Sequence, residues 1–355
     1  MHSVSPLYAA AELKAHEQRS NHAFAEAADS AEQAASIARQ SGDDTACWNM
    51  RFLQAENLLD AGQFAECASL SQSLLSESSR PVCQREVART YILLAKAQQG
   101  TGLLAEAAES ARAAGALTDN ESDVELNVKA RQALIAALAD GGRFDDAWEE
   151  SKRLSSVVSD DVEDQLAGKA YWVVGNVAFL CGRIEDGLRY HELAASTFSP
   201  TKNLDVWAKF NKASAAMRLA AEIADADTLR CIERAELATD VIGGTDLDVL
   251  LLRRNRAHWN FLAGDPEAAA AILEDICQMT TAPQLIGDAW FLLGRSYLAM
   301  GNESAARTAL TEAVTHFESA GAPHRAEQTR EFIAVELGPA ALWSRLWRAA
   351  GFGRH

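Results

Sequence analysis

The feature that most constrains this 355-residue chain is a turn signal that recurs at a nearly fixed interval. Short segments such as "DAGQF", "GTGLL" and "DGGRF" interrupt long stretches of helix-forming residues. The glycines of these segments are Gly62, Gly102, Gly142, Gly182, Gly264 and Gly301. The first four are 40 residues apart, two periods of about 41 lead to the fifth, and the last interval is 37. Such a period is typical of a chain built from stacked copies of one supersecondary unit.

A second sequence feature, a small residue, recurs at a fixed distance after each turn. Glycine supplies the left-handed backbone with which a helix can stop and the chain can fold back. The residue five positions after each turn is small, and "NHAF" at His22 marks the turn of a first copy. These small residues are Ala27, Cys67, Ala107, Ala147, Gly187, Ala269 and Ala306. Because a small side chain lets two helices approach closely, the pattern predicts antiparallel helix pairs.

The turn positions give the expected organisation of the chain. We expect one repeat array over 1–322 and C-terminal helices over 323–355, the first of them at about 324–337. The sixth hairpin has no turn glycine, so Asp225 or Asp227 is expected to cap its second helix. The hairpins are predicted at about 6–39, 45–78, 82–117, 122–158, 162–197, 203–241, 246–280 and 284–320. Strand-like alternation is nearly absent, and the predicted fold is all-α.

The eighth hairpin has the clearest sequence motif. Its residues Trp290, Leu293, Gly294 and Tyr297 match W-x2-L-G-x2-Y, and Gly301, Ala306 and Leu310 continue at the expected offsets. This segment resembles the tetratricopeptide repeat (TPR), and the whole array is loosely similar to the TPR modules of bacterial peptide-sensing regulators. The resemblance implies a right-handed superhelix of about eight hairpins with a C-terminal capping helix. The usual TPR has about 34 residues, whereas the interval here is about 40, so HEAT-type repeats are the alternative. The W-x2-L-G-x2-Y motif favours TPR.

Few residues point to catalysis or to a bound metal. No cysteine pair forms C-x-x-C, and the "HELAA" segment at His191 has Ala195 where a zinc protease needs its second histidine. Phosphate-binding and nucleophile-elbow motifs are missing from the sequence. We therefore expect neither an enzyme nor a cofactor.

The net charge and the N-terminal sequence limit the cellular location and the partners that we expect. A net charge of -17 disfavours direct binding to nucleic acid, and residues 1–20 are too short for a helix-turn-helix. The N-terminus lacks the pattern of a signal peptide, and no long apolar run could span a membrane. A cytoplasmic location is expected.

The first helices of the hairpins hold the candidate binding residues. By the TPR resemblance these helices line a concave groove, and positions counted back from each turn glycine indicate which side chains face it. The predicted groove residues are Arg89, Lys96, Lys129, Gln132, Lys169, Trp172, Asn176, Asn211, Arg254, His258, Phe291 and Arg295. Lys and Arg can hold carboxylates, amides can pair with a peptide backbone, and the aromatics offer apolar anchors. The alternative is that these are ordinary solvated residues of a helix face.

These observations favour a non-catalytic scaffold that captures a peptide or protein segment of acidic character, in regulation or signalling. One alternative is a sensor for a small signalling peptide that lacks its own DNA-binding domain. Another is an assembly protein or homodimer that self-associates through the segment after residue 338. There, Trp343, Leu346 and Trp347 lie on one apolar stripe at helical spacing beside several arginines. That stripe is expected to cap the array, to form a dimer contact, to dock on an anionic membrane surface, or to lead into a further domain.

Overall fold

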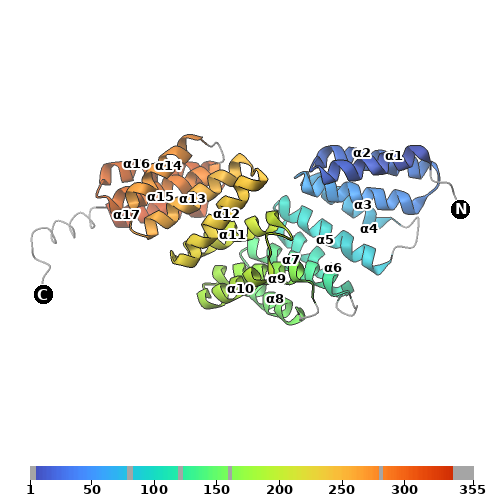
Figure 1. Ribbon diagram of the computed structural model, residues 1–355, viewed down its shortest axis with the longest axis horizontal. Helices are drawn as coiled ribbons and strands as arrows, with labels where there is room; N and C mark the ends of the chain where they lie inside the picture. The colour runs from blue at the N-terminus through green and yellow to red at the C-terminus, as the bar shows by residue number, and fades with distance from the viewer. Residues whose placement is uncertain (1–4, 78–82, 119–122, 159–161, 280–282, 339–355) are drawn as a thin grey trace, which may run out of the picture. The chain divides into compact units, whose positions relative to one another are not determined.

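A computed structural model describes residues 5–77, 83–118, 123–158, 162–279 and 283–338 (Figure 1). These residues form seventeen α-helices and no strand, which confirms the all-α prediction. The chain divides into two compact units, Met1–Thr197 and Phe198–His355. The sequence, which predicted one array over 1–322, gave no sign of this division.

Unit 1 consists of five helical hairpins. Their helices are α1 (Pro6–Ser20) and α2 (Phe24–Gln40), α3 (Asp44–Asp60) and α4 (Phe64–Ser76), α5 (Gln84–Gly100) and α6 (Leu104–Thr118), α7 (Val124–Asp140) and α8 (Phe144–Val157), and α9 (Asp164–Leu180) and α10 (Ile184–Thr197). Neighbouring helices contact one another in chain order, and the first helices α3, α5, α7 and α9 also contact each other in sequence.

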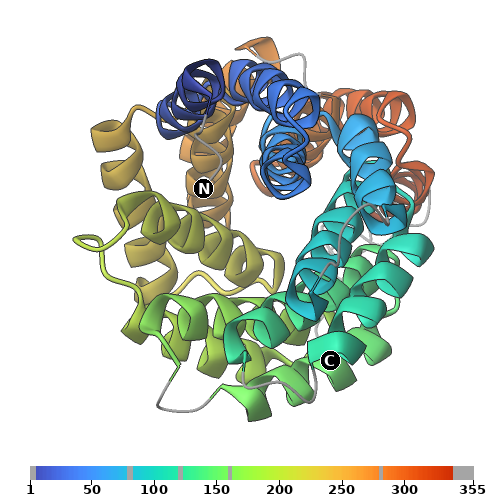
Figure 2. The ribbon, with the colours of Figure 1, turned by 90° about the vertical axis from the view of Figure 1, so that its right-hand side faces the viewer.

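Unit 2 consists of three hairpins and a final helix. Its helices are α11 (Leu204–Ala220) and α12 (Ala226–Ile242), α13 (Asp246–Leu262) and α14 (Pro266–Met279), α15 (Pro283–Ala299) and α16 (Glu303–Ser319), and α17 (Pro323–Leu337). The first helices α11, α13 and α15 contact each other in sequence. Figures 1 and 2 show the two helices of each hairpin side by side. The observed helix bounds differ from the predicted ones by at most two residues.

The turns work as the glycine signal predicts. Gly62 has a φ of 76°, and the N–H of Gln63 donates to the carbonyl of Leu58 at 2.9 Å, which closes the end of α3. The other five turn glycines also have positive φ. His22 and Glu222, both with a φ of 59°, take the same left-handed conformation in the first and sixth hairpins. A turn without glycine therefore keeps the geometry at a conformational cost of about 1 kcal/mol.

The sixth hairpin resolves the capping question. Asp225 is the N-cap of α12, and its side chain accepts a hydrogen bond from the N–H of Thr228 at 2.8 Å. Asp227 is the second residue of the helix and pairs with Arg230. Of the two aspartates considered, Asp225 is the cap.

The small residues after the turns are packed against the preceding helix. Ala27, Cys67, Ala107, Ala147, Ala269 and Ala306 are all fully buried. A Cβ placed on Gly187 would lie 2.8 Å from the ring of Phe179, so glycine is needed there for the two helices to meet. The final helix α17, expected at about 324–337, packs on α16 and buries Leu337 beside Leu310.

Two helical glycines give a matched test of this packing. A Cβ on Gly294 would lie 2.5 Å from Cγ of Leu310, whereas a Cβ on Gly115, in α6, would meet nothing within 4 Å. We expect Gly115→Ala to raise the free energy of unfolding by about 0.5–1 kcal/mol, because alanine restricts the unfolded chain and favours helix. Gly294→Ala should lower it by about 1–2 kcal/mol through overpacking. Denaturant unfolding of both variants checks this, and equal effects would contradict the close-approach role of Gly294.

Candidate functional site

A common helical register brings the candidate residues to one surface in each unit. Arg89, Ile92 and Lys96 precede Gly102 by 13, 10 and 6 residues. Separations of three and four residues place these side chains on one face of a helix. Residues at the same offsets before the other turns occupy the equivalent face of each first helix. Because first helices contact one another in chain order, these faces form a continuous strip within a unit.

In unit 1 this strip contains a hollow of about 190 Å³ between α3, α5 and α7, here called the first hollow. Its floor is apolar and consists of Phe52, Ile92, Leu93 and Leu126, all of them buried. Arg89 lies across this floor, with its guanidinium 4.3 Å from the ring centroid of Phe52. An apolar floor under a charged rim can hold an apolar side chain next to a polar one.

The rim of the first hollow carries both signs of charge. Arg89 Nη2 is 3.7 Å from a carboxylate oxygen of Glu56, and Arg85 Nη1 is 3.0 Å from Asp123. Lys129 pairs with Glu125 one helical turn earlier. Burial raises the pKa of Glu56, although Arg89 opposes the shift. Several of the predicted cations are therefore already partnered within the protein.

Lys96 and Lys169 differ from these cations. Both side chains are exposed, and among the described residues neither has an ion pair or hydrogen bond. The Lys96 ammonium reaches solvent from between the walls of the first hollow, so partial desolvation lowers its pKa, and the charges of Lys129 and Lys169 lower it further. Asp60 and Glu56 oppose the shift at Lys96, but neither lysine is held in an ion pair, so an incoming anion can pair with both.

The other predicted residues of unit 1 extend the strip along α7 and α9. Gln132 and Trp172 stand 10 residues before their turn glycines and are half-buried. The Nε2 atom of Gln132 is buried and has no partner within the described chain. Asn176 is engaged in packing, since its Oδ1 lies 3.0 Å from Nε2 of the buried His191. His191, which begins the incomplete zinc-protease motif, thus links α10 to α9.

In unit 2 the strip contains a larger hollow of about 490 Å³, here called the second hollow. Four predicted residues line it: Arg254, His258, Phe291 and Arg295. Arg254 Nη1 is 2.8 Å from Asp288, and Arg295 Nη2 is 3.2 Å from Glu222 while its guanidinium lies 4.8 Å from the ring of Phe261. Burial, then the charges of Arg295 and Arg254, lower the pKa of His258 to about 4.

Asn211 does not face this surface. Its side chain is 1% exposed, and its amide donates to the carbonyl of Trp207 at 2.8 Å. The prediction for Asn211 was wrong because the sixth hairpin has no turn glycine from which to count. Glu222 takes that place and sets the register of the hairpin. Lys212, 10 residues before Glu222, occupies the equivalent position and pairs with Asp248.

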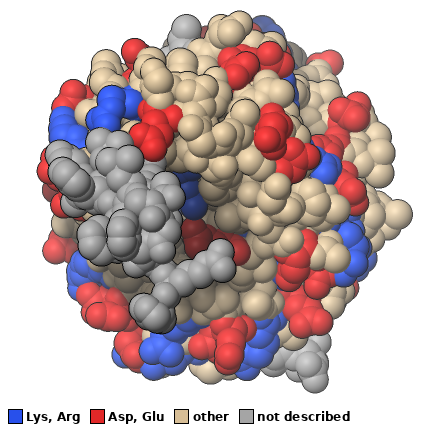
Figure 3. All heavy atoms as spheres, turned by 90° about the vertical axis from the view of Figure 1, so that its left-hand side faces the viewer, with Lys and Arg blue, Asp and Glu red and all other residues tan. Residues whose placement is uncertain are grey.

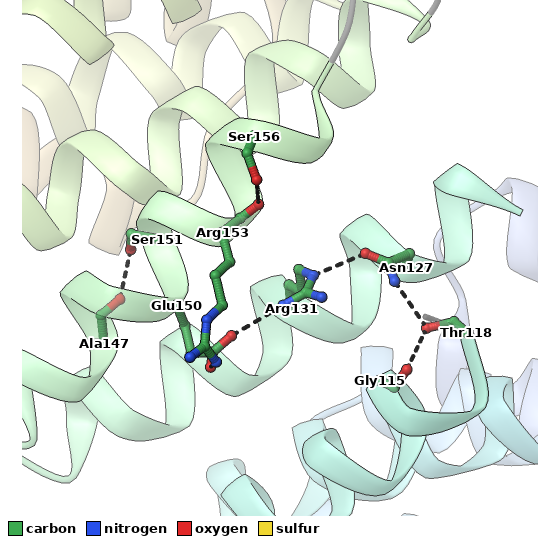
Figure 4. Close-up of polar contacts among 9 residues, drawn as sticks. All are labelled: Gly115, Thr118, Asn127, Arg131, Ala147, Glu150, Ser151, Arg153 and Ser156. Carbon is green, nitrogen blue, oxygen red and sulfur yellow. Dashed lines mark hydrogen bonds and ion pairs between the residues drawn. The ribbon is translucent and has the colours of Figure 1, made fainter. Parts of the chain in front are cut away.

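Sequence reasoning missed a polar cluster on the other side of α7. Arg131 Nε donates to Asn127 at 2.9 Å and its Nη1 donates to Glu150 on α8 at 3.1 Å (Figure 4). Arg153 also pairs with Glu150, which therefore bridges two arginines. No local signal connects residues 19 positions apart on different helices, so the pairing could not be read from spacing. Glu150 balances one of the two positive charges, and its contact with Arg131 joins the helices of the fourth hairpin.

On the face drawn in Figure 3, acidic and basic side chains are interspersed. In the part of the chain that the structure describes, no three His, Cys, Asp or Glu residues are grouped to hold a metal. None of the described helices combines the length and apolar character needed to cross a bilayer. The predicted tail residues Trp343, Leu346 and Trp347 lie outside the described residues, so their role stays a prediction from sequence.

Comparison with known proteins identifies the fold. No family model matches the chain, and no curated protein matches its sequence. Among solved structures, aspartyl phosphate phosphatase F from Bacillus subtilis is 13% identical, with a TM-score of 0.60 over 81% of this chain and 75% of that one. The apo form of RapI is 9% identical, with a TM-score of 0.61 over 77% of this chain and 98% of that one.

A Rap protein complexed with competence and sporulation factor is 11% identical, with a TM-score of 0.56 over 91% of this chain and 100% of that one. At such low identities the likeness shows the fold alone. The class of protein is a TPR-like helical repeat, as the lettering of the eighth hairpin predicted.

The pKa of His258 predicts a pH-dependent stability. Because it is lower in the folded protein than the value of about 6.5 in an unfolded chain, protonation favours unfolding. The contribution is complete above about pH 6.5 and is lost as the pH falls. Between about pH 7.5 and 5.5, wild type should lose about 1 kcal/mol more unfolding free energy than His258→Gln. Urea unfolding at both pH values measures this difference, and parallel losses in the two proteins would contradict it.

Proposed function

We propose that this protein is a non-catalytic scaffold that captures a peptide or protein segment of acidic character on the first-helix strip of unit 1. The observation that carries the proposal is the pair Lys96 and Lys169. Both are exposed, both lie on that strip, and among the described residues neither forms an ion pair or a hydrogen bond. In a protein with a net charge of -17, most cations elsewhere on the described surface are paired with carboxylates.

The first hollow supports the same proposal. Its apolar floor offers a place for an aliphatic or aromatic side chain, and Lys96 stands at its edge. A segment with an apolar residue beside Asp or Glu would match both features. The long helical strip also suits an extended segment, because side-chain amides such as that of Gln132 can pair with peptide N–H and C=O groups.

A sensor for a small signalling peptide is the second candidate. A specific observation favours it, since one of the similar structures is a Rap protein complexed with competence and sporulation factor. Another of the similar proteins is named an aspartyl phosphate phosphatase. The features that the described strips offer are cations beside apolar side chains, so capture rather than catalysis is proposed.

A selection with displayed random peptides tests the acidic-segment proposal. Peptides selected on the immobilised full chain at neutral pH should be enriched in Asp and Glu. They should bind Lys96→Gln/Lys169→Gln roughly 5- to 30-fold more weakly, because each lysine contributes a charge-assisted contact. Raising the salt concentration should narrow this gap, since exposed charges are screened. Fluorescence polarisation with labelled peptides measures both effects.

The matched control is Lys152→Gln/Arg153→Gln on α8. This variant also removes two positive charges, but from exposed positions outside the strip. Selected peptides should bind this control as tightly as wild type. Peptides without acidic enrichment, or equal weakening by the two double variants, would contradict a basic capture strip.

A further inference from the structure

The second hollow of unit 2 surrounds an unusual histidine. Its walls come from α11, α13, α15 and α17, and the small residues Ala216 and Ala220 of α11 leave it open. His258 is half-buried in the wall, one helical turn after Arg254. Its Nε2 atom is buried and has no hydrogen-bond partner among the described residues. A buried imidazole nitrogen without a partner is a cost that a bound ligand could remove.

The arginines beside His258 differ in how firmly they are held. Asp288 accepts from Arg254 and from Arg325, each at 2.8 Å, so one carboxylate is shared by two guanidinium groups. A guanidinium carries several N–H donors, and Arg254 therefore keeps donors free after this contact. Arg295 pairs with Glu222, a carboxylate that is 68% exposed. An exposed ion pair contributes little, so Arg295 can exchange Glu222 for another anion.

The charge of the second hollow defines the ligand that it suits. Arg254, Arg295 and Arg325 supply three positive charges, while Asp288 inside and Glu222 at the edge supply two negative ones. With neutral His258 the balance is a single positive charge, which one carboxylate would neutralise. A phosphate dianion would bring a second negative charge close to Asp288, and like charges at short range repel.

We propose that Arg254, Arg295 and the Nε2–H of His258 form a carboxylate-binding subsite in unit 2, with the apolar ring of Phe291 beside it. The subsite lies in unit 2 and goes beyond the capture proposed for unit 1, and its ligand is a carboxylate of a peptide. The bound group is either the C-terminal carboxylate of that peptide or the side chain of an Asp or Glu. The imidazole donates to one carboxylate oxygen and the arginines donate to both.

Binding at this position is linked to protonation of His258. Burial and the two arginines now disfavour the imidazolium, whereas a bound carboxylate would favour it. The other charged groups that line or border the hollow are Arg325, Asp288 and Glu222. Carboxylate binding therefore raises the pKa of His258, and affinity increases as the pH falls from 8 toward 6.

The test uses the full chain labelled with ¹⁵N-histidine at about pH 7, well above the pI of about 4.9. His258→Gln identifies the His258 resonances. Acetate is the first probe, with chloride at the same ionic strength as the reference. Acetate should shift the His258 signals to saturation, and Arg254→Gln and Arg295→Gln should each weaken its binding at least fivefold, because each removes a charge-assisted donor. Thermal unfolding of each variant checks that it is folded.

Arg256→Gln is the matched control. Arg256 lies on the same helix, but it pairs with Glu236 on α12 and is not among the residues lining the second hollow. This variant should bind acetate as wild type does. Two further probes separate the sources of the carboxylate: N-acetyl-glutamine has only a C-terminal carboxylate, and N-acetyl-glutamate α-amide has only a side-chain one. Tighter binding of either supports the subsite and identifies its source.

Three outcomes would overturn the subsite. They are the absence of a saturable shift at His258, equal acetate affinity in wild type and Arg295→Gln, and tighter binding of inorganic phosphate than of acetate. These readouts are independent of the peptide selection on the lysines of unit 1. If acetate binds at His258 but acidic peptides are not captured, the proposed function is wrong and the subsite stands. If acidic peptides are captured but acetate does not bind at His258, only the subsite is wrong.

Discussion

The close approach of two helices after each left-handed turn is the constraint on which the rest of the structure depends. A positive φ at residues such as Gly62 and Glu222 ends the first helix, and the buried small residue about five positions later lets the second helix lie against it. Because both features are tied to the turn, they also fix the rotation of the first helix. That rotation decides which side chains, at 13, 10 and 6 residues before the turn, reach the strip.

This dependence explains how much the sequence could predict. Turn glycines and small packing residues are local signals, so the hairpins and most members of the strip, from Arg89 to Arg295, follow from counting. Counting fails where the turn residue is not glycine. Glu222 adopts the left-handed conformation without any sequence signature, and Asn211 was therefore placed on the strip although it is buried beneath it. The separation into two units also has no local signature, because it depends on how densely successive helices contact one another along the chain.

Charge was harder to interpret than helix position. A sequence lists cations but does not show their partners, and pairs such as Arg254 with Asp288 join residues 34 positions apart. The structure therefore separates the predicted cations into those that the protein already pairs and those that it does not. Arg89, Lys129, Arg254 and Arg295 are held by carboxylates of the protein itself, which orients them and reduces their net field. Lys96 and Lys169, which look the same in the sequence, are the cations of the described strip left for an external anion.

His258 shows why a binding surface can oppose stability. The neutral imidazole of His258 lies near two arginines, its Nε2 has no hydrogen-bond partner within the described chain, and four helices form the hollow around it. Replacing such a group by an apolar one would remove the cost, so its position is understandable if something outside the chain supplies the missing acceptor. In the proposed subsite of unit 2 a ligand carboxylate is that acceptor, and Arg254 and Arg295 hold its negative charge.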